Sequence, residues 1–503
     1  MFSTLLILAH VGASVILAAY GAHRLSLALR YLRHVRRSDR VPAPLPTPLP
    51  RVTVQLPLYN ERYVAARGIE ALGALRYPRD RLQIQVLDDS TDGTTIVARK
   101  AVQRLRNQGL DAEYVPRSAR TGFKAGALAA GLDHATGELV AVLDADFVPD
   151  PAFLLALVAE FNDPTVAMVQ ARWSHLNAAS SVLTRAQALQ IDAHFTIEHG
   201  VRAATGCFFN FNGTAGIWRR RAIDAAGGWS AETLTEDLDL SLRAQLAGWR
   251  FVYRDDVEAP AELPVEIAGY RIQQQRWAQG GIQTAKKLLP RILRAAVPVR
   301  VKLEAFWQLT GHATYLMLVV LALTSLIAGW MISPMQRDLV FAFDGTLLLC
   351  SALCLTAFYG VAARSRGAAG WKRRVLLVPV IMLLGAGIAL GQAGAVLRGL
   401  RGTRTPFYRT PKYCVEGRRT TGWRSAPYRL AAPKATMAEL ATGTAVLALF
   451  AAAVLSGNAV ASGSGFLLGL GTISVGLGAL TQSRGTAEVP PNGVPHRREQ
   501  NRS

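Results

Sequence analysis

The first half of the chain alternates short apolar runs, rich in β-branched residues, with longer alanine-rich stretches. The apolar runs have the length and composition of buried strands: Val52–Leu56, Gln83–Leu87, Leu139–Leu143 and Val166–Gln170. The stretches between them have helical length and spacing: Glu61–Arg76, Thr94–Gln108 and Ala125–Ala135. Because strands that alternate with helices usually form a parallel sheet covered on both faces, this order predicts an α/β domain over residues 51–290.

Uncharged apolar runs fill the N-terminus and much of the second half of the chain. About 20 apolar residues suffice for a helix to cross a hydrocarbon layer of about 30 Å. The runs that meet this length are Phe2–Gly21, Ala305–Gln336, Gly345–Ala363 and Leu440–Ser483, the last long enough for two passes that turn near residues 456–458. We expect the first run to be an uncleaved anchor, because its basic residues follow the apolar stretch and do not precede it.

One further apolar run, Val375–Leu397, is flanked by basic residues on both sides. A full crossing would place one basic flank outside, against the usual excess of Lys and Arg on the cytosolic side. We therefore expect an interfacial or re-entrant element that returns to the cytosolic face, with Gly385, Gly387 and Gly391 permitting a bend.

These patterns divide the chain into seven parts. A membrane anchor (1–23) leads through a basic, proline-rich linker (24–50) into the α/β domain (51–290). An interfacial helix and two membrane helices follow (291–363), then a cytosolic segment (364–434), two more membrane helices (435–483) and a tail expected to be disordered (484–503).

Charge and cysteine content narrow the class of protein. The net charge is +21, and residues 290–503 carry +17 of it, from 24 Lys and Arg against 7 Asp and Glu. Positive charge beside apolar runs is what the positive-inside rule produces. We therefore expect an integral protein of the inner or plasma membrane, with a cytosolic α/β domain and no nucleic-acid partner. The four cysteines have no CxxC spacing, so they give no support to a zinc site or a disulfide framework.

Aspartates follow two of the predicted strands. Asp88 and Asp89 end one apolar run, and Asp144 and Asp146 end another. Ligands of parallel sheets sit at the carboxyl ends of the strands, so these groups are expected at one edge of the sheet. The GxGxxG fingerprint and the P-loop do not follow any strand, which argues against a dehydrogenase or a kinase. Aspartates at strand ends also act as turn formers, and that interpretation stays open for both pairs.

In the functional interpretation these aspartates bind a nucleotide diphosphate sugar. Asp144 and Asp146 would hold Mg²⁺ or Mn²⁺ through carboxylate oxygens, the ligands that such hard cations prefer. Asp88 and Asp89 would hydrogen-bond the base and the ribose. Lys124 would offer a positive charge to the phosphates.

A third acidic group, Glu236, Asp237 and Asp239, leads into a predicted helix over Leu240–Ala247. Acidic residues are common at helix N-termini, where the helix dipole favours them, so a purely structural interpretation is available here too. In the functional interpretation Asp237 is the general base that takes a proton from the acceptor hydroxyl, and burial beside Glu236 tunes its pKa.

Aromatic and polar residues complete an expected acceptor site. Arg276 offers a guanidinium to the pyrophosphate, while Gln273 and the Trp277 indole would bind the acceptor sugar, a buried core tryptophan being the alternative for Trp277. Further candidates for a wall along the growing chain are Trp173, Phe208, Phe209, Phe211, Asn212, Gly213 and Glu236. A last group, Asp192, His194, Glu198 and His199, lacks the HExxH spacing of a metal site and is interpreted as part of a helix with satisfied polar groups.

The motifs follow one another in a characteristic order: DDSTD (88–92), KAGAL (124–128), DADF (144–147), QARW (170–173), FNGTAG (211–216), TEDLDL (235–240) and QQQRW (273–277). This set resembles family-2 inverting glycosyltransferases, and among them the cellulose-synthase-like mannan and glucomannan synthases, over roughly residues 50–290. The resemblance implies a GT-A type fold with a Rossmann-like mixed sheet. It also implies synthesis of a linear β-1,4-linked mannan, glucomannan or glucan from GDP-mannose or UDP-glucose.

A second resemblance lies beyond that domain. The segment Phe407-Tyr-Arg-Thr410-Pro-Lys412 resembles the FxVTxK gating loop of cellulose synthases, with Arg409 where that pattern has valine. It implies that Phe407, Thr410 and Lys412 close over the active site. It also implies that Val375–Leu397 is an interfacial helix leading to the loop.

Two other functions stay open. A single-transfer lipid glucosyltransferase of the ceramide or diacylglycerol type shares the TED and xxRW motifs. A transporter without catalysis would need polar groups in its spans, and there the sequence offers little beyond His312 and Asp344. For the polymer synthase the expected partners are a nucleotide sugar, a polysaccharide acceptor and membrane lipid.

Overall fold

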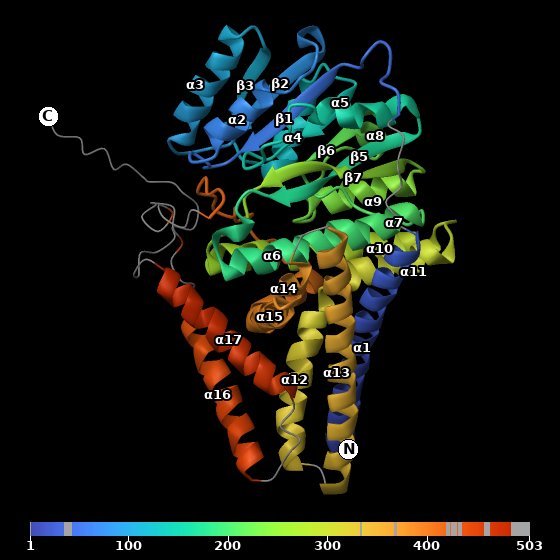
Figure 1. The fold of residues 1–503 in the computed structure, drawn as a ribbon, viewed down its shortest axis with the longest axis vertical. Helices are drawn as coiled ribbons and strands as arrows, with labels where there is room; N and C mark the ends of the chain where they lie inside the picture. The colour runs from blue at the N-terminus through green and yellow to red at the C-terminus, as the bar shows by residue number, and fades with distance from the viewer. Residues whose placement is uncertain are drawn as a thin grey trace, which may run out of the picture.

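The computed structural model describes residues 2–34, 43–331, 334–366, 370–418, 423, 430, 435–456 and 463–483. The expected disordered tail (484–503) lies outside these described residues, as do parts of the expected linker (35–42) and of the expected cytosolic segment. Figure 1 shows two layers: a sheet with its helices at the top, and a bundle of long helices below it.

The upper layer is built on a seven-stranded sheet in the order β3-β2-β1-β4-β6-β5-β7. Strand β6 is antiparallel to its neighbours β4 and β5, and the other pairs are parallel. The strands are β1 (Val52–Leu58), β2 (Leu82–Asp88), β3 (Asp111–Pro116), β4 (Leu139–Val142), β5 (Val166–His175), β6 (Gly216–Arg219) and β7 (Arg250–Ala261). The expected mixed sheet is confirmed, and β6 is the strand that makes it mixed.

Alternation along the strands divides the apolar side chains between two faces of the sheet. In β4, Leu139 and Ala141 join one core and Val140 and Val142 the other, because successive side chains of a strand point to opposite sides. Helices α2 (Ala65–Gly73), α3 (Thr94–Asn107) and α5 (Phe153–Val158) contribute to the first core. Helices α4 (Phe123–Asp133), α8 (Arg220–Ala225) and α9 (Glu236–Leu246) contribute to the second. The sheet is therefore covered on both faces, as expected.

Nine α-helices belong to the described part of the upper layer. They are α2 (Ala65–Gly73), α3 (Thr94–Asn107), α4 (Phe123–Asp133), α5 (Phe153–Val158), α6 (Val182–Ala193), α7 (Gly200–Ala204), α8 (Arg220–Ala225), α9 (Glu236–Leu246) and α10 (Ile267–Arg294). Three short 3₁₀ turns accompany them, η1 (Arg79–Arg81), η2 (Ala159–Asn162) and η3 (Ala178–Ser180), and the π-helical turn η4 (His194–His199) joins α6 to α7. In Figure 1, α6, α10 and α11 (Val299–Thr310) lie across the junction of the two layers.

The lower layer consists of long apolar helices together with one short basic helix of five residues, Trp371–Val375. They are α1 (Phe2–His34), α12 (Ala313–Met331), α13 (Pro334–Ser365), α14 (Trp371–Val375), α15 (Val378–Arg401), α16 (Ala435–Leu455) and α17 (Gly463–Gln482). Among the described residues, five helices are long and apolar enough to cross a membrane, or six if the bent pair α11 and α12 is one span. These helices make the chain an integral membrane protein.

Two expected elements have different bounds. The run Ala305–Gln336 is not one straight helix, because α11 and α12 meet at a bend of 60°. The interfacial helix expected to begin at residue 291 is not a separate element there either, since α10 continues through Pro290 to Arg294. The first difference arises because apolar composition continues across a change in chain direction, and the second because α10 continues through the basic stretch without a break.

Helix α15 covers the apolar run that was expected to lie at the interface. By length and composition alone, Trp371–Arg401 could cross a membrane. In Figure 1, however, α15 is seen nearly end-on between the two layers, while α12 and α13 run down through the lower layer. It contacts α10 of the upper layer as well as α12 and α17. Helix α15 thus lies between the two layers, and its position relative to the membrane stays a prediction.

Candidate active site

A cavity opens at the carboxyl edge of the sheet, and it collects most of the expected site residues. Strand β4 ends at Val142, and the chain then carries Asp144 and Asp146 into this space. We call it the upper cavity. Its lining includes Asp89, Lys124, Asp144, Asp146, Trp173, Asn212, Gly213, Glu236, Asp237, Gln273, Arg276, Trp277, Phe407, Thr410 and Lys412.

The two aspartates after β2 have different surroundings. Asp89 lines the upper cavity, and its carboxylate accepts hydrogen bonds from the guanidinium of Arg117, with Nε 2.7 Å from Oδ1. Asp88 is not among the lining residues. Its oxygens accept hydrogen bonds from the Ser90 backbone N–H at 2.9 Å and the Tyr114 hydroxyl at 2.7 Å. Asp88 thus holds the loop that presents Asp89.

Each carboxylate of the expected metal pair is paired with a lysine. Lys124 Nζ lies 2.6 Å from Asp144 Oδ1, and Lys412 Nζ lies 2.7 Å from Asp146 Oδ2. Burial alone would lower the pKa of Lys124, but the charges of Asp144 and Glu236 raise it above its usual value. Both lysines therefore balance the negative charge that the two aspartates bring into the cavity.

The oxygen donors present fit a divalent cation that shares its ligands with a diphosphate. Asp144 and Asp146 supply hard carboxylate oxygens two residues apart, the type that Mg²⁺ and Mn²⁺ prefer. Among the described residues no group of three His, Cys, Asp or Glu side chains could hold a metal by itself. Asp144 and Asp146 would therefore hold such a cation only together with further ligands.

Asp237 stands at the start of α9. The first turn of this helix contains Glu236, Asp237 and Asp239, and Asp237 Oδ1 accepts the Leu238 backbone N–H at 2.8 Å. Burial and the charge of Glu236 raise the pKa of Asp237 to about 7, although Lys124 and Arg276 act in the opposite direction. A carboxylate with this pKa is a competent proton acceptor near neutral pH.

Asp239 does not share this environment. It is fully buried, is paired with Arg243 and Lys287, and is not among the residues that line the upper cavity. Within the acidic group, therefore, only Glu236 and Asp237 face the cavity.

Helix α10 supplies the aromatic and cationic wall opposite the aspartates. Gln273, Arg276 and Trp277 all line the upper cavity, Gln273 and Trp277 being one helical turn apart. Burial lowers the pKa of Arg276, and the charges of Glu236 and Asp144 oppose that shift. The guanidinium of Arg276 also lies over the ring of Phe407, 4.4 Å from its centre.

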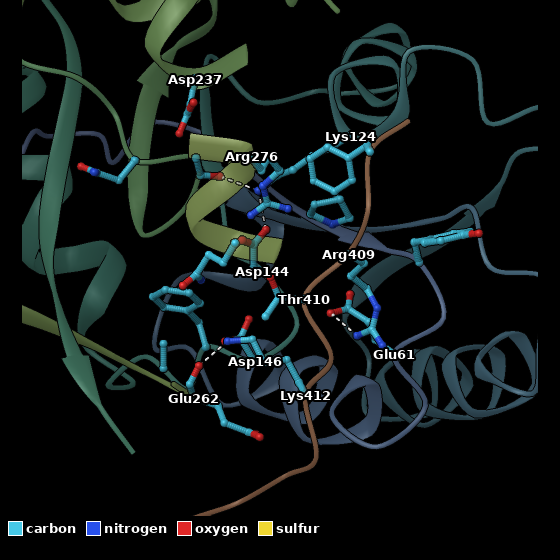
Figure 2. A pocket seen from close by; sticks show the side chains of 18 of the residues that line it. Glu61, Lys124, Asp144, Asp146, Asp237, Glu262, Arg276, Arg409, Thr410 and Lys412 are labelled. Carbon is cyan, nitrogen blue, oxygen red and sulfur yellow. Dashed lines mark hydrogen bonds and ion pairs between the residues drawn. The ribbon is translucent and has the colours of Figure 1, made fainter. Parts of the chain in front are cut away.

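Residues 402–418 cross the upper cavity as an extended loop. Phe407 packs between Arg276 and the ring of Phe123, and the buried hydroxyl of Thr410 has no hydrogen-bond partner among the described residues. Figure 2 shows this loop beside Asp146 and Glu61, with Asp237 on the far side of the cavity from Glu61. The three expected loop residues, Phe407, Thr410 and Lys412, thus line the same cavity as Asp237.

The aromatic wall expected from the sequence is only partly in place. Trp173 and Trp277 line the upper cavity. The structure corrects the placement of Phe209 and Phe211, which are 2% and 0% exposed and belong to the core between the sheet and α9. Their rings contact Phe251 and Trp218 respectively, so neither can stack on a sugar.

Sequence reasoning missed a third charged pair in the upper cavity. Arg409 Nη1 lies 3.1 Å from Glu61 Oε1 and ties the loop to the end of β1. Burial raises the pKa of Glu61 to about 7, against the opposing charge of Arg409 and with a further contribution from Asp146. Arg120 was missed as well, and its guanidinium lies 3.4 Å from the centre of the Tyr59 ring. For the contact between Glu61 and Arg409, the arginine at a position where the gating-loop pattern has valine was the one signal in the sequence.

Two further cavities continue from the upper cavity toward the membrane helices. The middle cavity shares Asp237, Trp277, Asn212 and Trp173 with the upper one and extends to His194, Trp307 and Tyr315. The membrane cavity shares Tyr20, Arg24 and Tyr315 with the middle one and is lined mainly by apolar side chains of α1, α12, α13 and α15. The three cavities adjoin one another from the aspartates into the lower layer.

Comparison with known proteins also indicates similarity to glycosyltransferases. The family model "Glycosyltransferase like family 2" matches residues 50–280. Glucomannan 4-beta-mannosyltransferase 1 of Oryza sativa subsp. japonica is 44% identical over 250 residues, which are 49% of this chain and 48% of that protein. Glucomannan 4-beta-mannosyltransferase 2 of Arabidopsis thaliana is 44% identical over 250 residues, 49% of this chain and 47% of that protein. The chain thus spans about half the length of the curated relatives it matches.

A solved structure supports the fold. The mannosyltransferase PcManGT from Pyrobaculum calidifontis, solved in complex with GDP-Man and Mn²⁺, is similar with a TM-score of 0.51 and 23% identity. The similarity covers 80% of this chain and 99% of that one. It confirms the expected GT-A type sheet. Residues 50–280 are therefore similar to family-2 glycosyltransferases and have the GT-A type fold.

Proposed function

We propose that the chain is a membrane-embedded, processive, inverting hexosyltransferase that builds a linear β-1,4-linked glycan from a nucleotide diphosphate sugar. The observation that carries this proposal is the continuity of the cavities. The upper cavity joins the aspartates and Lys124 to Asp237 and Trp277, and the middle and membrane cavities lead from there into the apolar helices. A polymer lengthened at Asp237 would find its exit in that direction.

The donor is proposed to bind on the loop side of the upper cavity. Asp89, presented by the loop that Asp88 holds, would bind the nucleoside, and Lys124 and Arg276 would contact the phosphates. Asp144 and Asp146 would hold Mg²⁺ or Mn²⁺ at the diphosphate, and the cation would neutralise the charge that develops on the leaving group. Phe407, Thr410 and Lys412 would cover the bound donor.

The acceptor is proposed to bind on the Asp237 side. Trp277 and Trp173 would pack against sugar faces, and Glu236, Gln273, Asn212 and Gly213 would surround the terminal residue of the chain. Asp237 takes the proton of the attacking hydroxyl, and the hydroxyl oxygen forms a bond to the anomeric carbon as the bond to the nucleotide diphosphate breaks. Attack from the face opposite the leaving group converts an α-linked donor into a β-glycoside.

The donor is proposed to be GDP-mannose, with UDP-glucose as the competing substrate. The curated relatives are named as mannosyltransferases, and the solved neighbour holds GDP-Man. The test is to incubate membranes with each labelled donor and to measure the size of the product before and after digestion with β-mannanase and β-glucanase. A polymer cut only by β-mannanase supports the proposal, and the release of free sugar alone contradicts it.

A lipid acceptor is the second candidate, and the membrane cavity favours it. It adjoins the middle cavity at Tyr20, Arg24 and Tyr315, and its mainly apolar lining could hold the alkyl part of a glycolipid. The same labelling experiment separates the two functions. A product that carries one sugar and partitions into organic solvent would replace the polymer synthase with a lipid glucosyltransferase.

We also propose that the glycosyltransferase domain and the loop of residues 402–418 face the cytosol. An impermeant thiol reagent tests this in a variant whose four cysteines are replaced, with a new cysteine at Arg418→Cys or Leu455→Cys. Both positions are exposed, and Leu455 ends α16 far from the sheet. Leu455→Cys should react in intact cells, while Arg418→Cys should react only after permeabilisation. Reaction of Arg418→Cys in intact cells would mean that α15 crosses the membrane.

A further inference from the structure

The middle cavity contains a histidine that the proposed mechanism does not use. His194 is the first residue of η4, the π-helical turn between α6 and α7. Such turns are rare and are frequent at functional sites, because the extra residue redirects the side chains around it. His194 lines the middle cavity together with Asp237 and Trp277.

The imidazole of His194 is held between a carboxylate and an amide. Its Nδ1 lies 2.9 Å from Glu198 Oε2, and its Nε2 lies 3.1 Å from Asn212 Nδ2. The amide nitrogen of Asn212 can only donate, so Nε2 is the acceptor of that hydrogen bond. The ring proton is then on Nδ1 and is donated to Glu198. His194 therefore presents a fixed hydrogen-bond acceptor toward the cavity.

Glu198 is fixed from the side of the membrane helices. Its carboxylate lies 3.5 Å from Arg24 of α1 and 3.5 Å from Arg202 of α7. Burial alone would raise the pKa of Glu198, but the hydrogen bond from His194 and the charge of Arg202 hold it well below its usual value. Glu198 is thus a permanent acceptor for the Nδ1 proton, and it keeps the imidazole in one orientation and one tautomer.

The other neighbour of His194 lies directly beside the proposed base. The Oδ1 atom of Asn212 is buried and has no partner among the described residues. The next residue, Gly213, is so close to the base that an added Cβ would lie 3.0 Å from Asp237 Oδ2. A hydroxyl group that bonds to His194 and Asn212 is therefore part of the sugar that Asp237 would deprotonate, or of the sugar next to it.

We propose that His194, oriented by Glu198, is a specificity-determining residue for the acceptor glycan. Its Nε2 accepts a hydrogen bond from an acceptor hydroxyl, which replaces the Asn212 amide, and this bond sets the orientation of the sugar on Trp277. The inference rests on the proposed function, because it requires a polyhydroxylated acceptor in the middle cavity. The ligand is a neutral hexose unit of the glycan chain.

The test uses the purified full chain in lipid nanodiscs, with GDP-mannose and UDP-glucose as donors and β-1,4-mannotetraose and cellotetraose as acceptors. Nucleotide diphosphate release and oligosaccharide extension are measured separately. His194→Phe should raise the acceptor KM about 3- to 10-fold, the scale of one uncharged hydrogen bond, and leave the donor KM unchanged. It should also raise the fraction of donor hydrolysed by water. His194→Gln, which keeps an acceptor oxygen, should recover part of the loss.

His199→Gln is the matched control. His199 belongs to the same π-helical turn, with its ring centre 4.4 Å from that of His194, but it is fully buried and bonds to the Asn210 carbonyl. It does not line the middle cavity, so its replacement should lower the melting temperature without raising the acceptor KM.

Three outcomes are decisive against the inference. An unchanged acceptor KM and hydrolysis ratio in His194→Phe overturn it while leaving the proposed function intact. Equal effects of His194→Phe and His199→Gln on both KM values overturn it in favour of a structural role. A wild-type chain that releases no nucleotide from either donor overturns the proposed function itself.

Discussion

Asp237→Asn is expected to lower the rate of sugar transfer at least about 100-fold, the usual scale for loss of a general base. Asparagine keeps the size of the side chain but cannot take the proton of the attacking hydroxyl. Donor affinity should change little, because Asp237 is proposed to act on the acceptor and lies across the cavity from the loop that would cover the donor. Transfer is measured with a labelled donor, and donor affinity by titration without acceptor.

The pH dependence provides an independent check on the same residue. With a pKa of about 7, Asp237 is protonated as the pH falls below neutrality, so kcat/KM should fall on the acid side of about pH 7 and be retained above it. Glu236→Gln is the matched variant. It removes the negative charge that raises the pKa of Asp237, so the acid limb should move to lower pH and the loss of rate should be smaller than in Asp237→Asn.

These two results together identify the base. Near-normal turnover in Asp237→Asn would remove Asp237 from that role and leave Glu236 as the remaining carboxylate of the group that faces the cavity. An acid limb that Glu236→Gln leaves in place would instead point to Glu61, whose pKa is also raised to about 7 and which lies on the other side of the cavity.

The parallel part of the sheet could be predicted from sequence because its strands are buried on both faces. The run Leu139–Leu143 is apolar throughout and is followed by Asp144, and the structure has β4 there. The run Val52–Leu56 includes Thr53 and Gln55, but its length and β-branched residues still predicted β1. Strand β6 could not be predicted in this way. It has only four residues, Gly216–Arg219, and its antiparallel position depends on pairing with β4 and β5 and not on any local pattern.

The site could be predicted only in part, because a sequence does not show how side chains are oriented in irregular segments. The segment Phe208-Phe-Asn-Phe211 has neither strand nor helix periodicity, so no pattern indicates which rings face a cavity and which join the core. Phe209 and Phe211 are in the core, while the next two residues, Asn212 and Gly213, line the cavity.

Contacts between segments that lie far apart along the chain could not be predicted from the sequence either. The pair of Glu61 and Arg409 joins residues 348 positions apart, and no local pattern links them. Asp144, Asp237 and Trp277, in contrast, belong to motifs in which the residue type alone suggests the chemistry. Their common cavity was therefore an expectation that the geometry agrees with, while their individual roles stay proposals.

Removal of divalent cations is expected to stop transfer, with at least about a 100-fold loss that Mg²⁺ or Mn²⁺ reverses, because metal stabilisation of a developing charge is worth several kcal/mol. Asp146→Asn should weaken donor binding at least about 10-fold in the presence of the cation, since even the hydrogen-bonding partners of metal ligands contribute about 10- to 100-fold. Donor binding is measured by titration with and without chelator. Full activity in excess chelator would contradict the metal assignment.

The comparison with and without chelator is needed because Asp146 has a second partner. Its carboxylate lies 2.7 Å from Lys412 Nζ, and Lys412 also donates to the Glu262 carbonyl. If Asp146 acts through the cation, the loss of donor affinity in Asp146→Asn should disappear when chelator is present in both samples. If it acts by holding the loop of residues 402–418, the loss should persist without metal and should match that of Lys412→Met. Equal losses under both conditions would therefore remove Asp146 from the proposed metal site and leave it as an anchor of the loop.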